Sequence, residues 1–327
     1  MTMSPTQQPS PVPPPERPAG ISFVVTVYNK RPFLPQMVAG LAAQQGDFAR
    51  EYIFVDDGST DGSADEVQRL TTDWTNVRIV QQENCGPSIA TNRGIEAARH
   101  PFIKLVDADD VLLPWASAHL LRALRDNPGA VLARGETEPY RTPEIAFERL
   151  GQSIEPSSPP PTVDCDPVRT TLLQHFGLGP TNTLIATEAA RRVGACDPRV
   201  FVQDYSLVLR LATAGPFVVL DETVALCAAE AEGRVNDDGP QVLHDVNLVI
   251  AHFLAEHSLP PALAARAVRR ATGRAWRWAR RREGASPLSR WSMLRLRALL
   301  PCPPYTLVQE SCGAFTQSCV VRQPNGG

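Results

Sequence analysis

Long apolar segments are absent from this sequence of 327 residues. No run approaches the ~18–20 apolar residues that a membrane-spanning helix needs, and residues 1–20 lack the apolar core of a signal peptide. The seven cysteines include no CxxC pair, which argues against both a zinc site and a disulfide framework. We therefore expect a cytoplasmic protein with free thiols.

Several catalytic motifs are also missing. The chain has no GxSxG elbow, HExxH helix, Walker loop or GxGxxG fingerprint, which argues against the hydrolases, metalloproteases and nucleotide-binding enzymes that these motifs mark. His252 and His257 are out of helical register for a metal pair, so we expect them on the surface. Lysine is scarce: only Lys30 and Lys104 accompany 30 arginines, which indicates a coding bias rather than a binding function.

The most informative stretch is residues 102–114, where an apolar segment of strand length ends in Asp107, Asp109 and Asp110. Such a run is typical of a buried strand in a parallel sheet, and these sheets bind ligands beyond the carboxyl ends of their strands. Neighbouring carboxylates repel one another unless a hard divalent cation neutralises them. Two interpretations stay open on these residues alone: a metal and diphosphate site at Asp107 and Asp109, or a turn in which one Asp caps the helix that begins near Pro114.

Strands and helices alternate before this stretch. Strands are predicted at residues 21–27, 52–55 and 77–80, and helical spacing is present at residues 33–41 and 87–99. This alternation predicts right-handed βαβ units and an α/β fold with a mostly parallel central sheet flanked by helices.

Four short motifs follow one another between Val27 and Asp110. They are Val27-Tyr28-Asn29, Val55-Asp56-Asp57-Gly58-Ser59-Thr60-Asp61, Gly86-Pro87-Ser88 with Asn92 and Gly94, and Asp107-Ala108-Asp109-Asp110. In order and spacing they resemble the nucleotide-sugar half of family 2 glycosyltransferases. The resemblance covers about residues 20–225, and it implies an α/β fold of the GT-A type.

The resemblance assigns roles to these motifs by position. Asp109 matches the direct ligand of a divalent cation, Mn²⁺ or Mg²⁺, and Asp204 matches the catalytic base, the Asp of a Glu-Asp pair. The chain departs from the pattern at Gln203, which replaces the usual Glu, and at Thr91, which precedes Asn92 where a basic residue is common. The residues matched to contacts with the nucleotide sugar are Val27, Tyr28, Asn29, Asp57, Asn92, Arg93, Asp107 and Ala108.

Ordinary structural roles stay open for three of these residues. The ring of Tyr28 can lie against a nucleobase or pack in the core. Asp57 can accept a hydrogen bond from an N–H of uracil or cap the following helix. Asp204 opens an amphipathic helix with Leu207 and Leu211 on its apolar side, so it can act as a base or merely cap that helix and favour its dipole.

Proline content, charge and periodicity divide the chain into four expected parts. These are a disordered Pro-rich leader at 1–20, a catalytic domain at 21–225, a helical extension at 226–300 and a disordered tail at 301–327. The catalytic domain comprises a nucleotide-sugar half at 21–135 and an acceptor half at 136–225, which contains a Pro-rich loop at 139–167.

The helical extension is strongly basic. Residues 262–300 carry eleven Arg and one acid, a charge of +10 that leaves −13 for the rest of a chain whose net charge is −3. An apolar stripe and an arginine stripe lie at helical spacing: Leu263, Ala267, Ala271, Ala275 and Trp278 beside Arg266, Arg270, Arg274, Arg277 and Arg281. This pattern predicts a basic amphipathic helix, which either rests on an anionic membrane surface or folds against the acidic remainder of the chain.

Together these features predict an inverting, metal-dependent glycosyltransferase. It would move a sugar from a nucleoside diphosphate donor, expected to be a UDP-sugar, to the hydroxyl of a sugar or lipid-linked sugar in surface polysaccharide or glycolipid assembly. We expect it in the cytoplasm or at the inner face of the membrane, and nucleic acid is not an expected partner. Two alternatives stay open: a sugar-phosphate nucleotidyltransferase, whose Gly-rich phosphate loop is missing at residues 28–32, and a catalytically silent nucleotide-sugar binding protein.

Overall fold

A computed structural model describes residues 20–152, 159–174, 179–229, 239–284, 286, 288–300 and 303–316. Strands and helices alternate through the first part of the chain, as predicted. The strands are β1 (Gly20–Val27), β2 (Ala49–Asp56), β3 (Val77–Gln81), β4 (Phe102–Asp107) and β5 (Val111–Leu112). The helices are the 3-10 helix η1 (Arg31–Phe33), α1 (Leu34–Ala42), α2 (Ser63–Leu70), α3 (Pro87–Ala97) and α4 (Ala116–Asp126). The expected leader lies outside the described residues except for Gly20, which begins β1.

The second part of the chain extends the sheet with β6 (Leu132–Tyr140), β7 (Thr162–Asp164), β8 (Thr183–Ala186) and β9 (Phe217–Ala228). Its helices are α5 (Pro143–Leu150), α6 (Pro167–Leu173), the 3-10 helix η2 (Pro180–Asn182), α7 (Thr187–Arg192) and α8 (Gln203–Leu211). Much of the stretch predicted as a Pro-rich loop is therefore regular structure, although its residues 153–158 lie outside the described part. Pro143 and Pro167 occupy first helical turns, where proline favours a helix because no N–H is needed there.

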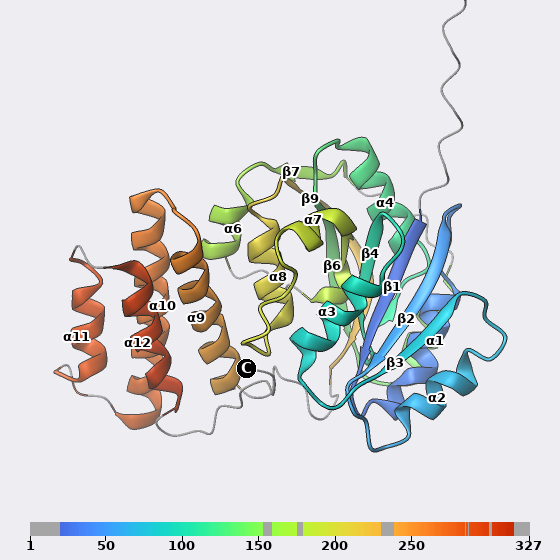
Figure 1. The fold of residues 1–327 in the computed structure, drawn as a ribbon, viewed down its shortest axis with the longest axis horizontal. Helices are drawn as coiled ribbons and strands as arrows, with labels where there is room; N and C mark the ends of the chain where they lie inside the picture. The colour runs from blue at the N-terminus through green and yellow to red at the C-terminus, as the bar shows by residue number, and fades with distance from the viewer. Residues whose placement is uncertain are drawn as a thin grey trace, which may run out of the picture.

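The strands described here form one sheet in the order β3-β2-β1-β4-β8-β6-β9-β5, with β7 paired to β9. Strands β1 to β4 pair in parallel, whereas β8 runs antiparallel to both β4 and β6. Figure 1 shows helices on both faces of this sheet. The architecture confirms the predicted α/β fold, with the motifs concentrated in the parallel half.

Side-chain alternation along β1 explains the two layers of helices. Phe23 and Val25 pack on one face with α1, α2 and α4, and Val24 packs on the other with α3, α7 and α8. Gly94 lets α3 approach β1 closely, because a Cβ there would lie 2.1 Å from Val24 Cγ1. The glycine of the third motif is therefore a packing requirement.

Four C-terminal helices form a further layer beside α6 and α8 (Figure 1). They are α9 (Gly239–Glu256), α10 (Pro261–Glu283), α11 (Arg290–Arg297) and α12 (Pro304–Thr316). Their apolar side chains share one buried cluster with Leu172 of α6 and Leu209 of α8. Among the described helices, none combines the length and the apolar character needed to cross a bilayer.

Two expectations about this layer are wrong. The tail was predicted to be disordered from residue 301, but α12 buries Leu307 and Phe315 against its neighbours; residues 317–327 lie outside the described part. Packing on α9 and α10 supplies the stability of this helix. The basic segment is two helices rather than one, because Gly284 ends α10 in a left-handed conformation with φ of 61°.

Candidate active site

The carboxyl ends of β1, β2 and β4 meet at one edge of the sheet. In the parallel register Val27 pairs with Asp56, and Thr26 pairs with Asp107. Asp57, one residue beyond β2, donates its backbone N–H to Val27 O over 2.8 Å. Three of the sequence motifs therefore lie side by side, where parallel sheets place their ligand sites.

Asn29 holds the first motif to the second. Its φ of 52° is left-handed, which asparagine tolerates better than most residues. Its backbone N–H donates to Ser59 Oγ over 3.0 Å, and its Oδ1 accepts the Thr60 N–H over 2.8 Å. The adjacent Tyr28 is 48% exposed, so the alternative that it packs in the core is wrong.

Asp57 organises the loop that leads into α3. Its buried carboxylate accepts hydrogen bonds from the Gln82 side chain at 2.7 Å and from the N–H groups of Cys85 and Gly86, each at 2.9 Å. Helix α2 has no side-chain cap, so the capping alternative for Asp57 is wrong. Because a carboxylate has about four acceptor positions, Asp57 has room for a further donor such as a base N–H.

The acidic motif forms a turn after β4, with the Asp110 N–H donating to Asp107 O over 3.0 Å. This turn directs neighbouring carboxylates to different partners. Asp109 Oδ2 lies 3.0 Å from Lys30 Nζ, and Asp110 Oδ2 accepts a hydrogen bond from Thr181 Oγ1 at 2.7 Å. Helix α4 has no side-chain cap, so the capping alternative fails here as well.

Both lysines of the chain lie at this motif. Lys30 reaches Asp109 from the loop after β1, and Lys104 is fully buried on β4. Burial lowers the pKa of Lys104 to about 7, and the Asp110 carboxylate partly offsets this effect. Each lysine places an amino group near a carboxylate, which relieves repulsion among the acids. The interpretation of lysine scarcity as a coding bias stays a prediction, and the two lysines present both lie beside acids of this motif.

The oxygen donors at Asp109 suit a divalent cation that a substrate helps to bind. The described residues contain no group of three or more His, Cys, Asp or Glu side chains placed to hold a metal. Mg²⁺ is commonly bound through one or two carboxylates together with substrate phosphates. Asp109 is buried, and its backbone oxygen accepts the Tyr140 O–H over 2.7 Å. A carboxylate fixed in this way fits the single protein ligand of such a site.

The candidate base lies at the start of α8. Gln203 connects this helix to the acidic motif, because its Oε1 accepts from Thr91 Oγ1 at 3.0 Å and its Nε2 donates to Asp107 Oδ1 at 3.4 Å. Burial raises the pKa of the adjacent Asp204 to about 6, against the opposing effect of a hydrogen bond from the Tyr205 N–H. Helix α8 has no side-chain cap, so Asp204 does not serve as one.

Comparison with known proteins agrees with this geometry. The family model described as glycosyl transferase family 2 matches residues 22–175, the part of the chain that contains all four motifs. Residues 22–175 form a glycosyltransferase family 2 domain.

The curated relatives of this chain match it over only part of their own length. Glycosyltransferase GlyG of Streptococcus pneumoniae is 38% identical over 93 residues, which are 28% of this chain and 31% of that protein. The poly-β-1,6-N-acetyl-D-glucosamine synthase of Staphylococcus aureus is 24% identical over 209 residues, 64% of this chain and 49% of that protein. The chain thus spans less than half the length of these curated relatives.

Solved structures of similar proteins cover nearly the whole chain. TarS 1–349 of S. aureus in complex with UDP-GlcNAc has a TM-score of 0.62 at 16% identity, covering 93% of both chains. The mannosyltransferase PcManGT from Pyrobaculum calidifontis, in complex with GDP-Man and Mn²⁺, has a TM-score of 0.56 at 16% identity, covering 93% of this chain and 87% of that one. These likenesses confirm the predicted GT-A fold.

Three residues matched to the nucleotide sugar differ in their surroundings. Asn92 Nδ2 donates to Cys196 O at 2.9 Å, and its Oδ1 accepts the Cys196 N–H at 2.8 Å, so its amide ties α3 to the loop before α8. Arg93 is exposed, and Ala108 is buried in the acidic turn. Contact of these three with a donor stays a prediction.

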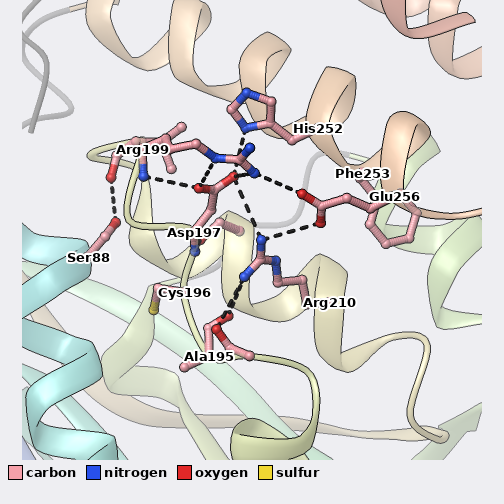
Figure 2. A network of polar contacts seen from close by, with 12 residues as sticks. Ser88, Ala195, Cys196, Asp197, Arg199, Arg210, His252, Phe253 and Glu256 are labelled. Atoms are coloured by element: carbon pink, nitrogen blue, oxygen red, sulfur yellow. Dashed lines mark hydrogen bonds and ion pairs between the residues drawn. The ribbon is translucent and has the colours of Figure 1, made fainter. Parts of the chain in front are cut away.

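A buried carboxylate fixes the segment between α7 and α8 (Figure 2). Asp197 accepts three hydrogen bonds from Arg199 at 2.8–3.0 Å and one from His252 Nδ1 at 2.7 Å. Arg199 and Arg210 also pair with Glu256 of α9. His252 is therefore a partner in a buried network, and its expected surface position is wrong. Because α9 belongs to the C-terminal layer, the network joins that layer to the segment that leads into α8.

Replacing Asp197 by Asn is expected to destabilise the fold by about 3 kcal/mol at pH 7, because the cationic partners would lose their buried counter-ion. Burial by itself would raise the pKa of Asp197, but hydrogen bonds from His252 and Arg199 hold it well below its ordinary value of 3.8. Its contribution to stability is therefore present above about pH 4 and is lost as the pH falls further.

Thermal unfolding of wild type and Asp197→Asn at pH 7 and at pH 3 measures this effect. The difference in melting temperature should shrink at pH 3. Glu188→Gln is the matched control, since it removes an ion pair with Arg191 at the surface and should change the melting temperature little. If both variants lose the same melting temperature at pH 7, the Asp197 network stabilises the fold no more than a surface ion pair does.

Proposed function

We propose that this chain transfers a sugar from a UDP-sugar to a hydroxyl acceptor, with inversion at the anomeric carbon and with the help of Mn²⁺ or Mg²⁺. The hydrogen bond from Gln203 to Asp107 carries this proposal, because it joins the residue that precedes the candidate base in the chain to the acids at the end of β4. Inverting transfer needs a carboxylate on the donor side and a proton acceptor near the acceptor hydroxyl. The raised pKa of Asp204, about 6, suits the second role.

Each group has a part in the reaction. The acceptor oxygen bonds to the anomeric carbon while the bond from that carbon to the diphosphate breaks on the opposite side, so one displacement inverts the configuration. Asp204 takes the proton of the acceptor hydroxyl, and the nucleoside diphosphate leaves with the electron pair. Asp109 would hold the cation, which supplies positive charge to stabilise the leaving diphosphate. Tyr28 and Asp57 would hold the nucleobase of the donor.

The two alternative functions have less support. A nucleotidyltransferase would need a Gly-rich phosphate loop after β1, whereas this chain passes through Asn29 and Lys30 directly into η1. A silent binding protein would have no use for a half-buried carboxylate with a raised pKa at the proposed acceptor side. The family 2 match also favours transfer.

The proposed acceptor is a sugar or lipid-linked sugar in surface polysaccharide or glycolipid assembly. The similar synthase of S. aureus is named for poly-β-1,6-N-acetyl-D-glucosamine, and a protein similar to parts of this chain in Rhizobium meliloti is named for succinoglycan biosynthesis. These names support a polysaccharide product, and the donors in the similar structures, UDP-GlcNAc and GDP-Man, support a nucleotide sugar.

A donor screen tests the proposed function. Purified protein is incubated with UDP-, GDP- and dTDP-sugars, and released nucleoside diphosphate is measured with Mn²⁺, with Mg²⁺ and with EDTA. We expect the fastest release from a UDP-sugar and loss of release in EDTA. Release that EDTA leaves unchanged would contradict metal dependence. Formation of nucleotide sugar from a nucleoside triphosphate and a sugar phosphate would instead identify a nucleotidyltransferase.

We also propose that the C-terminal layer contacts an anionic membrane at the inner face through α11. Trp291 and Leu294 of this helix are buried, while Met293 and Leu296 are exposed on its other side. Further exposed apolar residues follow or flank them: Leu288, Leu299, Leu300 and Tyr305. An apolar surface amid a segment of charge +10 matches an anionic bilayer, where each basic residue contributes on the order of 1 kcal/mol.

Co-sedimentation with vesicles tests this contact. Wild type is expected to bind phosphatidylglycerol vesicles at low salt, and Met293→Gln with Leu296→Gln is expected to weaken binding about tenfold. The control is Ile145→Gln with Phe147→Gln, which removes two exposed apolar side chains of α5 and should leave binding unchanged. The membrane proposal is wrong if wild type ignores these vesicles.

A further inference from the structure

Arginines of α10 surround a hollow of about 420 Å³ beside α6. The lining residues are Arg266, Arg269, Arg270, Arg274, Arg277 and Leu173. Within the described part of the chain, no carboxylate forms an ion pair with Arg266, Arg269, Arg270 or Arg277. Like charges gathered in this way repel one another, so the hollow favours an anion.

The inner wall of the hollow is built into the fold. Arg274 is buried, and its Nε donates to Asn247 Oδ1 over 2.9 Å. Arg270 Nε is also buried and has no hydrogen-bond partner among the described residues. Burial lowers the pKa of Arg274 to about 10, and the charges of Arg270 and Arg277 act in the same direction. Because this pKa is still above neutral pH, the side chain stays cationic there. Fixed guanidinium groups of this kind are pre-organised for phosphate oxygens.

Tyr205 connects the hollow to the candidate active site. It follows Asp204 directly in α8, and its hydroxyl donates to Thr171 O of α6 at 3.4 Å. Burial raises the pKa of Tyr205 to about 12, and the charges of Arg274 and Arg270 partly offset this effect. The arginines therefore lie on the Tyr205 side of α8, whereas Gln203 of the same helix faces Asp107 of the acidic motif.

We propose that this hollow binds a phosphate or diphosphate group of the acceptor. The proposal rests on the proposed function, because the acceptor is the substrate whose hydroxyl Asp204 would deprotonate. Several arginines match a diphosphate, which carries negative charge and paired oxygens, far better than they match a neutral sugar. Such a group occurs in a lipid-linked sugar diphosphate and in a glycan with phosphodiester links, and the hollow recognises the chemistry that both share.

Binding of inorganic diphosphate tests the site directly. Equilibrium dialysis with the full chain in EDTA compares wild type, Arg266→Gln with Arg269→Gln, and the matched control Arg281→Gln with Arg282→Gln. Both pairs remove two exposed arginines of α10, but only the first pair lines the hollow. We expect affinity to fall about tenfold or more in the first variant and to stay within about twofold in the control. Equal weakening in both variants overturns the proposal.

Competition distinguishes the sources of the phosphate group. Displacement of bound diphosphate by a short-chain prenyl diphosphate supports a lipid-linked acceptor, and displacement only by a glycan phosphodiester supports a polymeric one. Displacement by phosphatidylglycerol vesicles to the same extent in both arginine variants would show a general basic surface and overturn the site. Absence of UDP-sugar hydrolysis from wild type would contradict the proposed function, whereas the diphosphate-binding measurements would still decide whether the hollow is a binding site.

Discussion

Asp109→Asn is expected to reduce metal-dependent turnover of the donor by about 10³-fold, because a neutral amide cannot hold the cation that stabilises the leaving diphosphate. The fold should survive, since the amide oxygen can still accept a hydrogen bond from Lys30, whose Nζ lies 3.0 Å from Asp109 Oδ2. Release of UDP from the donor at increasing Mn²⁺ concentration measures the effect, and circular dichroism checks the fold.

Asp65→Asn is the control for this variant. Asp65 is an exposed acid in the first turn of α2, so its loss removes the same charge without touching the acidic motif, and turnover should match that of wild type. If Asp109→Asn retains metal-dependent turnover at the level of Asp65→Asn, Asp109 is not the metal ligand.

Asp204→Asn is expected to lower sugar transfer by ~10²–10⁴-fold while donor affinity stays the same, because the proton acceptor is lost and the donor side is untouched. In wild type, transfer should fall as the pH drops through about 6, where Asp204 takes up its proton. Above that pH the carboxylate is ionised and active. The measurement is the pH profile of kcat/KM for transfer, beside the Kd of UDP.

Stability provides a second readout for Asp204. A carboxylate whose pKa is raised in the fold is less stable in its ionised form there than in the unfolded chain, so a neutral Asn should not lower the melting temperature at pH 7. A lower melting temperature, or a parallel loss of donor affinity, would assign Asp204 to structure rather than to proton transfer.

The sequence predicted the parallel half of the sheet because that half is specified locally. Each strand there is an apolar run that ends in turn residues, so both the strand and its end can be recognised from neighbouring residues. The motif residues Val27, Asp57 and Asp107 could be placed at one edge for the same reason, since the carboxyl ends of parallel strands share an edge.

Contacts between distant residues could not be predicted in this way. Lys30 and Asp109 are 79 positions apart, and no local pattern joins them. The one available signal was that each of the two lysines in this arginine-rich chain stands within three positions of one of the four motifs. Gln203 was recognised as a departure from the family pattern, but its hydrogen bond to Asp107 depends on the packing of α8 against the sheet.

Helix α12 was missed because small and polar side chains interrupt its buried apolar face. Ser311, Cys312 and Ala314 lie inside together with Phe315, and Ser311 Oγ accepts a hydrogen bond from Asn247 Nδ2 at 2.8 Å. Small and polar side chains of this kind give a weak helical period, and the helix exists because α9 and α10 offer a matching surface.

The apolar cluster shared by α6, α8 and the C-terminal layer also determines how the molecule unfolds. Val200 and Leu209 belong to one buried cluster with side chains of α9 and α10, and Asp197 has a hydrogen-bond partner in α9. Melting of the C-terminal helices would therefore expose the apolar side of α8 and release the segment that orients Gln203 and Asp204. We therefore expect the layer and the N-terminal end of α8 to unfold together. The order of the residue proposed to take the proton would then depend on helices that begin 35 positions later, at Gly239.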